Sequence, residues 1–188
     1  MSMDGPEANG SSAEMEGLKY PVGRFRARSG LTPAERGSRI EEMAALPGDL
    51  RAVVSGLSPR QLDTPYRPAG WSVRQVVHHL PDSHMNGYVR CKLAVTEIDP
   101  TVKTYGEAAW AELADARGED IESSLLLLEA LHRRWTRFLR SLDGGQFQRA
   151  FLHPELGRIT LETNLQLYAW HGRHHLAHIT ELGERLGW

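Results

Sequence analysis

Residues 170–178 read Trp-His-Gly-Arg-His-His-Leu-Ala-His and hold four of the nine histidines in this sequence of 188 residues. Their neighbours have the apolar spacing of a helix, in which residues three and four positions apart stand above one another. His171, His175 and His178 therefore lie along one predicted face. Two imidazoles at positions i and i+4 of a helix can chelate one divalent metal ion. The stretch predicts a helix that directs histidine ligands toward the interior of the fold.

A second histidine cluster lies far upstream, in residues 77–84, which read Val-His-His-Leu-Pro-Asp-Ser-His. Burying so many imidazoles without partners would cost desolvation energy, so we expect the fold to bring the two clusters together around a metal ion. Spacing alone does not decide the ligands. The candidates are one of His78, His79 and His84 together with either His171 and His175 or His174 and His178. His132 and His153, which stand outside both clusters, are interpreted as packing residues.

Composition excludes several classes of protein. A net charge of −2 and a pI near 6.5 argue against nucleic-acid binding, which needs a basic excess. No apolar run approaches the roughly 20 residues that span a bilayer, and residues 1–16 lack the features of a secretory signal. The one cysteine, Cys91, cannot form an internal disulfide and is expected in the core. We expect a cytoplasmic protein that binds neither membranes nor nucleic acids.

Helical spacing and capping signals predict four long helices, over about 33–57, 72–98, 121–142 and 161–186. Capping boxes are expected at Thr32 with Glu35 and at Ser72 with Gln75. Pro47-Gly48 predicts a kink or restart in the first helix, and Pro81 predicts a bend in the second. On the last helix, one polar face is expected to meet solvent. It consists of Glu162, Gln166, Arg173, Thr180 and Glu184.

Four helices with histidine on two inward faces predict an all-α fold, a four-helix bundle with a metal site in its core. Residues 99–119 form a connection long enough to be a crossover, and residues 146–160 predict an irregular segment or small hairpin before the last helix. Residues 1–19 are poor in bulky apolar side chains and predict a disordered tail. Residues 20–188 then form one domain, which begins with an extended anchoring segment at residues 20–25.

Three imidazoles without a carboxylate or thiolate suit Zn²⁺ or Ni²⁺. Three protein ligands leave a coordination position open, which is typical of a catalytic site, and a water bound there ionises near pH ~7. Asp82 follows the upstream cluster closely. Its carboxylate is either a surface charge or a group that orients one of the imidazoles.

Several segments together resemble the DinB/YfiT-like family of metal-dependent hydrolases, in particular its YfiT branch. The two signatures are Trp-Ser-Val-Arg-Gln-Val-Val-His-His-Leu at 71–80, followed by Asp82-Ser83-His84-Met85-Asn86, and Trp-His-Gly-Arg-His-His-Leu-Ala-His-Ile at 170–179. The resemblance extends over about residues 18–188. Shorter family-like segments lie at 20–23, 105–113 and 153–157.

The resemblance implies a bundle of up-down-down-up order, a homodimer, and one zinc or nickel ion per subunit. The ligand eight residues after the tryptophan that opens the second helix falls on His79, and the paired ligands fall on His171 and His175. The resemblance implies that His78, His174 and His178 contact these ligands or line the pocket. Asp82 and Asn86, which share the predicted helix face of His79, are further candidates for contact with the ligands. Pro81 departs from the family pattern, in which a small or aliphatic residue is usual.

The resemblance also implies an activity on a small-molecule substrate. The first candidate is a hydrolase in which the metal activates water. The alternative is a thiol S-transferase, similar to bacillithiol S-transferases and mycothiol-dependent isomerases, in which the metal ionises a low-molecular-weight thiol that attacks an electrophile. A further alternative is a bundle that binds metal or ligand without turnover. Hydrolysis and thiol transfer both need the open metal position, so the sequence does not separate these two chemistries.

Overall fold

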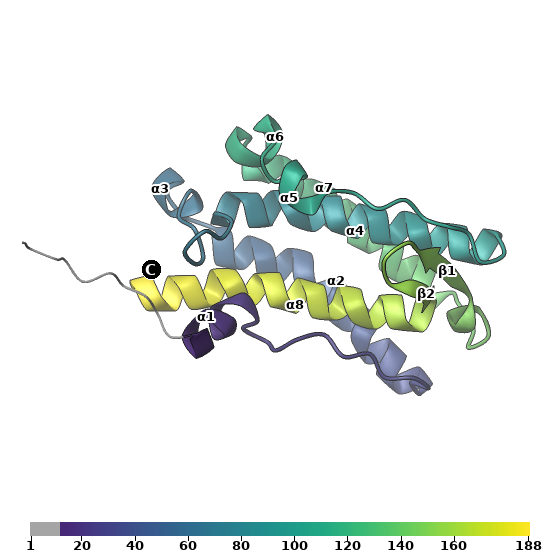
Figure 1. Cartoon of the computed structure of the whole chain (residues 1–188). Coiled ribbons are helices and arrows are strands. Elements are labelled where there is room, and N and C mark those ends of the chain that lie inside the picture. The colour runs from purple at the N-terminus through teal and green to yellow at the C-terminus, as the bar shows by residue number, and fades with distance from the viewer. Residues whose placement is uncertain (1–11) are drawn as a thin grey trace, which may run out of the picture.

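Four long helices form the body of the molecule in a computed structural model, of which residues 12–188 are described (Figure 1). Short helices, one 3₁₀ turn and a two-stranded hairpin connect them. The helices and the turn are α1 (Ser12–Lys19), α2 (Pro33–Val54), α3 (Pro59–Leu62), α4 (Val73–Thr96), α5 (Glu107–Trp110), α6 (Ala114–Gly118), α7 (Ile121–Arg140), η1 (Gln146–Gln148) and α8 (Leu161–Leu186). The strands are β1 (Ala150–His153) and β2 (Gly157–Thr160).

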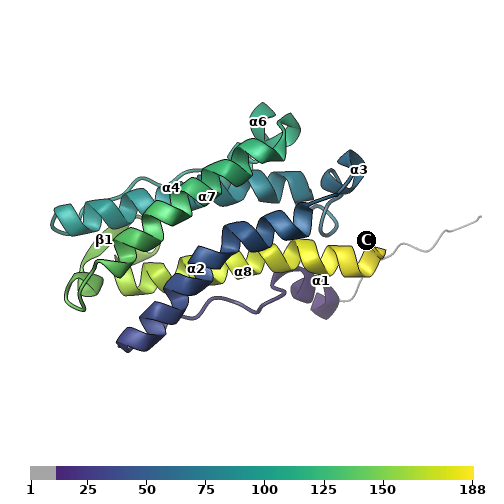
Figure 2. The same cartoon turned by 180° about the vertical axis from the view of Figure 1, so that it is seen from behind.

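The long helices follow the expected up-down-down-up order (Figures 1 and 2). Helices α2 and α8 run one way and α4 and α7 run the other, so each helix packs against two neighbours around the bundle. Because α4 and α7 are parallel, residues 97–120 must return along the bundle, and they carry α5 and α6 across α4 as the predicted crossover. None of the described helices is long and apolar enough to cross a membrane.

The expected hairpin precedes α8. Strands β1 and β2 pair antiparallel, with Ala150 opposite Thr160. The crossover joins the same structure, because the Val102 N–H donates to the Leu152 carbonyl over 3.0 Å and the Leu152 N–H donates to the Pro100 carbonyl over 2.9 Å. The hairpin thus closes one end of the bundle and fixes the start of α8.

The capping motifs in the sequence correctly predicted where α2 and α4 begin. Thr32 with Glu35 and Ser72 with Gln75 both form complete capping boxes, and Pro33 occupies the first turn of α2. Helix α2 continues through Pro47, so the restart considered from the sequence is wrong. Helix α4 likewise continues through Pro81. Both prolines are buried, and tertiary packing holds the helices together where one ladder hydrogen bond is missing.

The N-terminal segment differs from the prediction of disorder over residues 1–19. Residues 12–19 form α1, whereas residues 1–11 lie outside the described part of the chain. None of the α1 residues is buried. The helix is tied instead through an ion pair between Arg24 and Glu16 and through the Lys19 carbonyl, which accepts from Nε2 of His178 over 3.3 Å. A contact through a backbone carbonyl leaves no apolar pattern in the sequence.

The predicted solvent face of α8 is wrong at its first two positions. Glu162 and Gln166 are 3% and 8% exposed, because residues 20–31, which we call the strap, run along this part of α8. The Gly30 N–H donates to the Glu162 carboxylate over 2.9 Å, and Gln166 exchanges two hydrogen bonds with the backbone of Arg28. Polar side chains that satisfy a covering backbone are indistinguishable in sequence from side chains that face water.

The core contains two apolar clusters with a layer of histidines between them. On α7, for example, Leu128 belongs to one cluster, Trp135 belongs to the other, and His132 lies between them. On α8, which runs in the opposite direction, the order is reversed, from Tyr168 in the Trp135 cluster through the histidines to Ile179 in the Leu128 cluster. We call this the histidine layer; it consists of His79, His84, His132, His171 and His175.

Candidate metal centre

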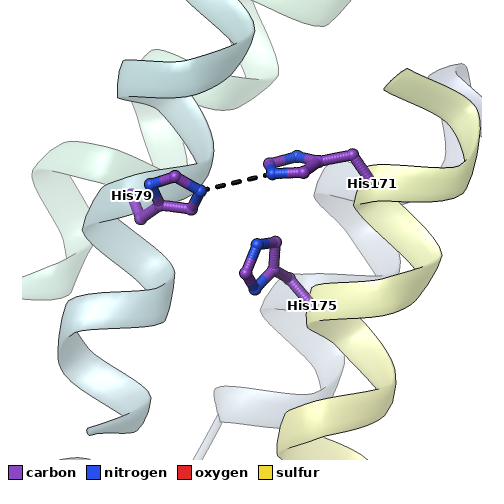
Figure 3. Close-up of side chains that lie close together, drawn as sticks. All are labelled: His79, His171 and His175. Atoms are coloured by element: carbon purple, nitrogen blue, oxygen red, sulfur yellow. Dashed lines mark hydrogen bonds between the residues drawn. The ribbon is translucent and has the colours of Figure 1, made fainter. Parts of the chain in front are cut away.

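His79 on α4 faces His171 and His175 on α8 across the bundle (Figure 3). The two Nε2 atoms of His79 and His171 lie 3.3 Å apart. The ring of His175 lies 4.8 Å from that of His79 and 4.5 Å from that of His171, measured between centroids. One nitrogen from each ring lies within 4.8 Å of the other two. The structure therefore brings together the three residues that the resemblance implies as ligands.

Packing around α8 explains how the pair is held. His171 and His175 are four positions apart, so both point to the same side of the helix. Gly172 lies on the adjoining face against α2, where an added Cβ would lie 2.6 Å from Cδ2 of Leu46. Because Gly172 has no side chain, α8 can pack closely against α2. This close packing sets how far His171 and His175 extend into the core of the bundle. Trp71 completes the group, with its ring 4.7 Å from that of His79.

Burial keeps the three imidazoles neutral. Desolvation, with a smaller contribution from neighbouring imidazoles, lowers the pKa of His79 from 6.5 to about 4 and the pKa values of His171 and His175 well below 6.5. Neutral imidazoles each offer one lone pair, and three lone pairs that face one another repel unless a proton or a cation lies between them. Nδ1 of His175 is buried without a hydrogen-bond partner among the described residues. The donor set fits a divalent transition-metal ion.

Two further histidines, His84 and His132, are connected to the group of three by hydrogen bonds through His171. Nε2 of His84 lies 3.1 Å from Nδ1 of His171, and Nδ1 of His84 lies 2.8 Å from Nε2 of His132. Nδ1 of His132 in turn donates to the Met43 carbonyl over 2.5 Å. The interpretation of His132 as simple packing is therefore incomplete, because the residue is hydrogen-bonded toward the candidate centre. Its spacing gave no signal, since it stands alone on α7.

The remaining clustered histidines lie elsewhere. His78 hydrogen-bonds to Ser124 over 2.7 Å and to the Glu119 carbonyl over 3.2 Å, so it joins α4 to α7 rather than entering the group of three. A second possible ligand group on α8 consists of His174, His175 and His178 and shares one residue with the first. His178 also stacks on Tyr66 at 3.9 Å between ring centroids. Two possible metal-binding groups therefore lie next to each other, and they share His175 on α8.

Two other candidates do not touch the imidazoles. The amide of Asn86 donates to the Asp82 backbone carbonyl over 2.9 Å, and within residues 12–188 no hydrogen bond joins either side chain to a histidine. Desolvation, followed by repulsion from Asp115, raises the pKa of Asp82 to about 6. Cys91 is fully buried, and burial raises the pKa of its thiol to about 12, which confirms it as a core residue.

A cavity of about 480 Å³ opens onto the group of three. Aromatic residues Tyr66, Trp71 and Trp170 form part of its wall, and Glu107 on α5 is an acidic residue that also lines it. Partial desolvation raises the pKa of Glu107. Residue spacing did not single out Glu107, although it lies in the family-like segment 105–113, because it reaches the cavity only through the course of the crossover.

The fold and the site together define a four-helix bundle with a candidate histidine metal centre in its core. The chain belongs to the DinB superfamily, whose family model matches residues 42–179. A relative in Bacillus subtilis, named "Putative metal-dependent hydrolase YfiT", is 49% identical over 172 residues, which cover 91% of this chain and 97% of the relative. A relative in Bacillus cereus (strain 03BB102), named "Putative metal-dependent hydrolase", is 49% identical and covers 93% of this chain and 100% of its own.

Solved structures agree with this assignment. The structure described as "YfiT from Bacillus subtilis is a probable metal-dependent hydrolase with an unusual four-helix bundle topology" matches with a TM-score of 0.90 and 48% identity, over 92% of this chain and 99% of that one. The four-helix bundle protein TT2238 matches with a TM-score of 0.53 and 18% identity, over 75% and 94% of the two chains, which shows a shared fold alone.

Proposed function

We propose that the protein is a metal-dependent hydrolase in which His79, His171 and His175 hold one divalent metal ion. The observation that carries the proposal is the convergence of three neutral imidazoles, two of them with Nε2 atoms 3.3 Å apart, beside an open cavity. Nitrogen donors without a thiolate or carboxylate favour Zn²⁺ first and Ni²⁺ next. The names of the relatives support the same class of reaction.

When bound, such an ion supplies an open coordination position and lowers the pKa of a coordinated water from about 15.7 to about 7. The rest of the chemistry falls to the side chains of this chain. Trp71 and Trp170 limit the access of bulk water to the cavity and offer flat apolar surfaces to a small-molecule substrate. Glu107, in the same cavity, accepts a proton at its carboxylate as the attacking water adds to the substrate carbonyl.

The test begins with metal-stripped protein reloaded with zinc or nickel. Its hydrolysis of a panel of simple esters and amides is measured, and conjugation of a monohalobimane is measured with and without low-molecular-weight thiols. We expect a hydrolytic rate that returns with the metal and needs no thiol. A metal-dependent rate that requires a thiol would overturn hydrolysis in favour of the S-transferase. Tight metal binding without turnover in either assay would favour the binding bundle.

Substitution assigns the ligands within the same assay. His171→Ala and His175→Ala are expected to lose both the bound metal and the activity, because two remaining imidazoles hold the ion weakly. His153→Ala is the matched control, since His153 lies on β1 outside both histidine groups. Full metal content in both α8 variants would remove the assigned pair.

We also propose that the protein is a homodimer, as the family resemblance implies. Helix α7 carries Leu126 and Leu127, which are 55% and 44% exposed and adjoin each other on the outer surface. Sedimentation velocity at micromolar concentration is expected to give a mass near twice 21.1 kDa. A monomer mass over the whole concentration range would contradict the proposal.

A further inference from the structure

A series of hydrogen bonds runs from the backbone of α2 to the candidate metal ligand His171. It passes from the Met43 carbonyl to His132 over 2.5 Å, from His132 to His84 over 2.8 Å, and from His84 to His171 over 3.1 Å. We propose that His84 and His132, which we call the imidazole link, are positioning residues that fix which nitrogen of His171 is free to bind the metal. This rests on the proposed function only in taking His171 as a ligand.

The donor and acceptor of each hydrogen bond in the series follow from the backbone carbonyl at one end of it. A backbone carbonyl can only accept, so Nδ1 of His132 carries the proton. A neutral imidazole has one N–H, so Nε2 of His132 must accept from Nδ1 of His84. Nε2 of His84 then accepts from Nδ1 of His171. The lone pair of His171 is left on Nε2, which is the atom that lies 3.3 Å from Nε2 of His79.

The surroundings of the link hold it in the neutral form that this deduction requires. His84 is 0% exposed and His132 is 1% exposed. Their ring neighbours are Trp135 from α7 and Tyr168 from α8, both uncharged, together with the imidazole of His171. A buried imidazole without a facing carboxylate stays neutral, because burial penalises its charged form.

The imidazole link matters because the opposite tautomer of His171 could not bind a metal ion through the nitrogen that faces His79. If His171 carried its proton on Nε2, the nitrogen that faces His79 would have no lone pair for a cation. Metal-ligating histidines generally donate their other N–H to a fixed acceptor, and losing such an acceptor typically costs about 10–100-fold in metal affinity. Here the acceptor is another imidazole, and the backbone of α2 sets its tautomer through a third.

The direct test reads the tautomers in the metal-free protein. Long-range ¹H–¹⁵N spectra of protein labelled at histidine distinguish protonation at Nδ1 from protonation at Nε2. The signals are assigned from their disappearance in His84→Gln and His132→Gln proteins and in the His171→Ala protein. We expect His84, His132 and His171 all to carry the proton on Nδ1. An Nε2–H tautomer at His84 or at His171 would overturn the proposal.

A second measurement tests the consequence for binding, with zinc affinity determined by competition against a chromophoric chelator. His132→Leu, which removes the acceptor of the His84 proton, is expected to weaken zinc binding about 10–100-fold. His132→Gln, whose amide oxygen can accept that proton, is expected to restore most of the affinity. The matched control is His78→Gln, since His78 is also buried and hydrogen-bonded but lies outside the link.

The outcomes of these two measurements distinguish a failure of the imidazole-link proposal from a failure of the proposed metal-dependent function. Equal weakening by Leu and Gln at position 132, or no weakening by either, would contradict the positioning role. If wild-type protein binds no zinc, the proposed function fails while the tautomer spectra still test the hydrogen bonds. If zinc binds and the tautomers differ from those expected, the imidazole link fails alone. The spectra of the wild-type protein decide the matter even if His132→Leu does not fold.

Discussion

Glu107 is the one carboxylate among the described residues that line the cavity beside the three imidazoles. Partial desolvation raises its pKa, which makes it a better proton acceptor than a fully solvated glutamate. Glu107→Gln is expected to lower kcat by about 10²–10⁴-fold while the zinc content stays unchanged, because the residue moves a proton and holds no metal. Steady-state kinetics and metal analysis of the same preparation check both parts.

The control for this substitution is Glu184→Gln, since Glu184 is exposed, does not line the cavity and does not contribute to the pKa shift of Glu107. Its kcat should equal that of the wild type. A Glu107→Gln protein with unchanged kcat would remove the residue from the chemistry and leave it as a surface charge near the cavity mouth.

The buried imidazoles also make the stability of the metal-free protein depend on pH. Burial lowers the pKa of His132 from 6.5 to about 4, and His84 and His171 shift in the same direction. Between these values the unfolded chain binds protons that the folded protein excludes, so stability falls as pH falls. The loss begins near pH 6.5, continues toward pH 4, and amounts to on the order of 1–3 kcal/mol for His132 alone.

Urea unfolding of metal-free protein between pH 7.5 and pH 4.5 measures this dependence. The free energy of unfolding is expected to decline across that range, and His132→Gln should show a shallower decline because it removes one titrating group. Glutamine does not titrate, and the other buried imidazoles remain. A stability independent of pH below 6.5 would show that these histidines are not excluded from protonation by the fold.

Among the elements, both α2 and the strap are attached to α8 through one buried carboxylate, that of Glu162. Arg36 contacts the Glu162 carboxylate over 3.0 Å, and the same carboxylate accepts from the Gly30 N–H. Glu162→Ala leaves the guanidinium without its partner in a site where the Arg36 side chain is only 14% exposed. We expect a loss of about 3 kcal/mol in the free energy of unfolding.

Chemical denaturation of Glu162→Ala and of the control Glu184→Ala, which changes an exposed residue of the same helix, checks this value. The control should unfold like the wild type. Limited proteolysis is expected to cut the Glu162→Ala protein within residues 20–31 sooner than the wild type, because the strap loses the hydrogen bond from the Gly30 N–H to α8. Equal stability of the two variants would mean that the Glu162 carboxylate does not stabilise the fold.

The sequence predicted those elements whose signals are local. Capping boxes and apolar stripes located the four long helices, and the turn residues before α8 indicated the hairpin. It did not predict α1 or the burial of Glu162 and Gln166. Both depend on contacts between a polar side chain and a distant backbone, and such contacts have no periodicity to detect.

For the whole molecule, the all-α class and the crossover followed from helix count and connection length. Residue spacing narrowed the candidate centre to two clusters but did not choose His79 over His78 and His84. That choice depends on how α4 faces α8, which only the family resemblance implied. The sequence predicted His132 only as a packing residue and assigned no role to Glu107, since each reaches the histidine layer or the cavity from a different element.

The central claim is that His79, His171 and His175 share one metal ion. Anomalous diffraction from crystals of zinc-loaded protein, collected on both sides of the zinc absorption edge, measures it most directly. The account predicts one strong peak about 2.0–2.1 Å from a nitrogen of each of these three rings. A peak held by His174, His175 and His178 instead, or no peak between α4 and α8, would contradict it.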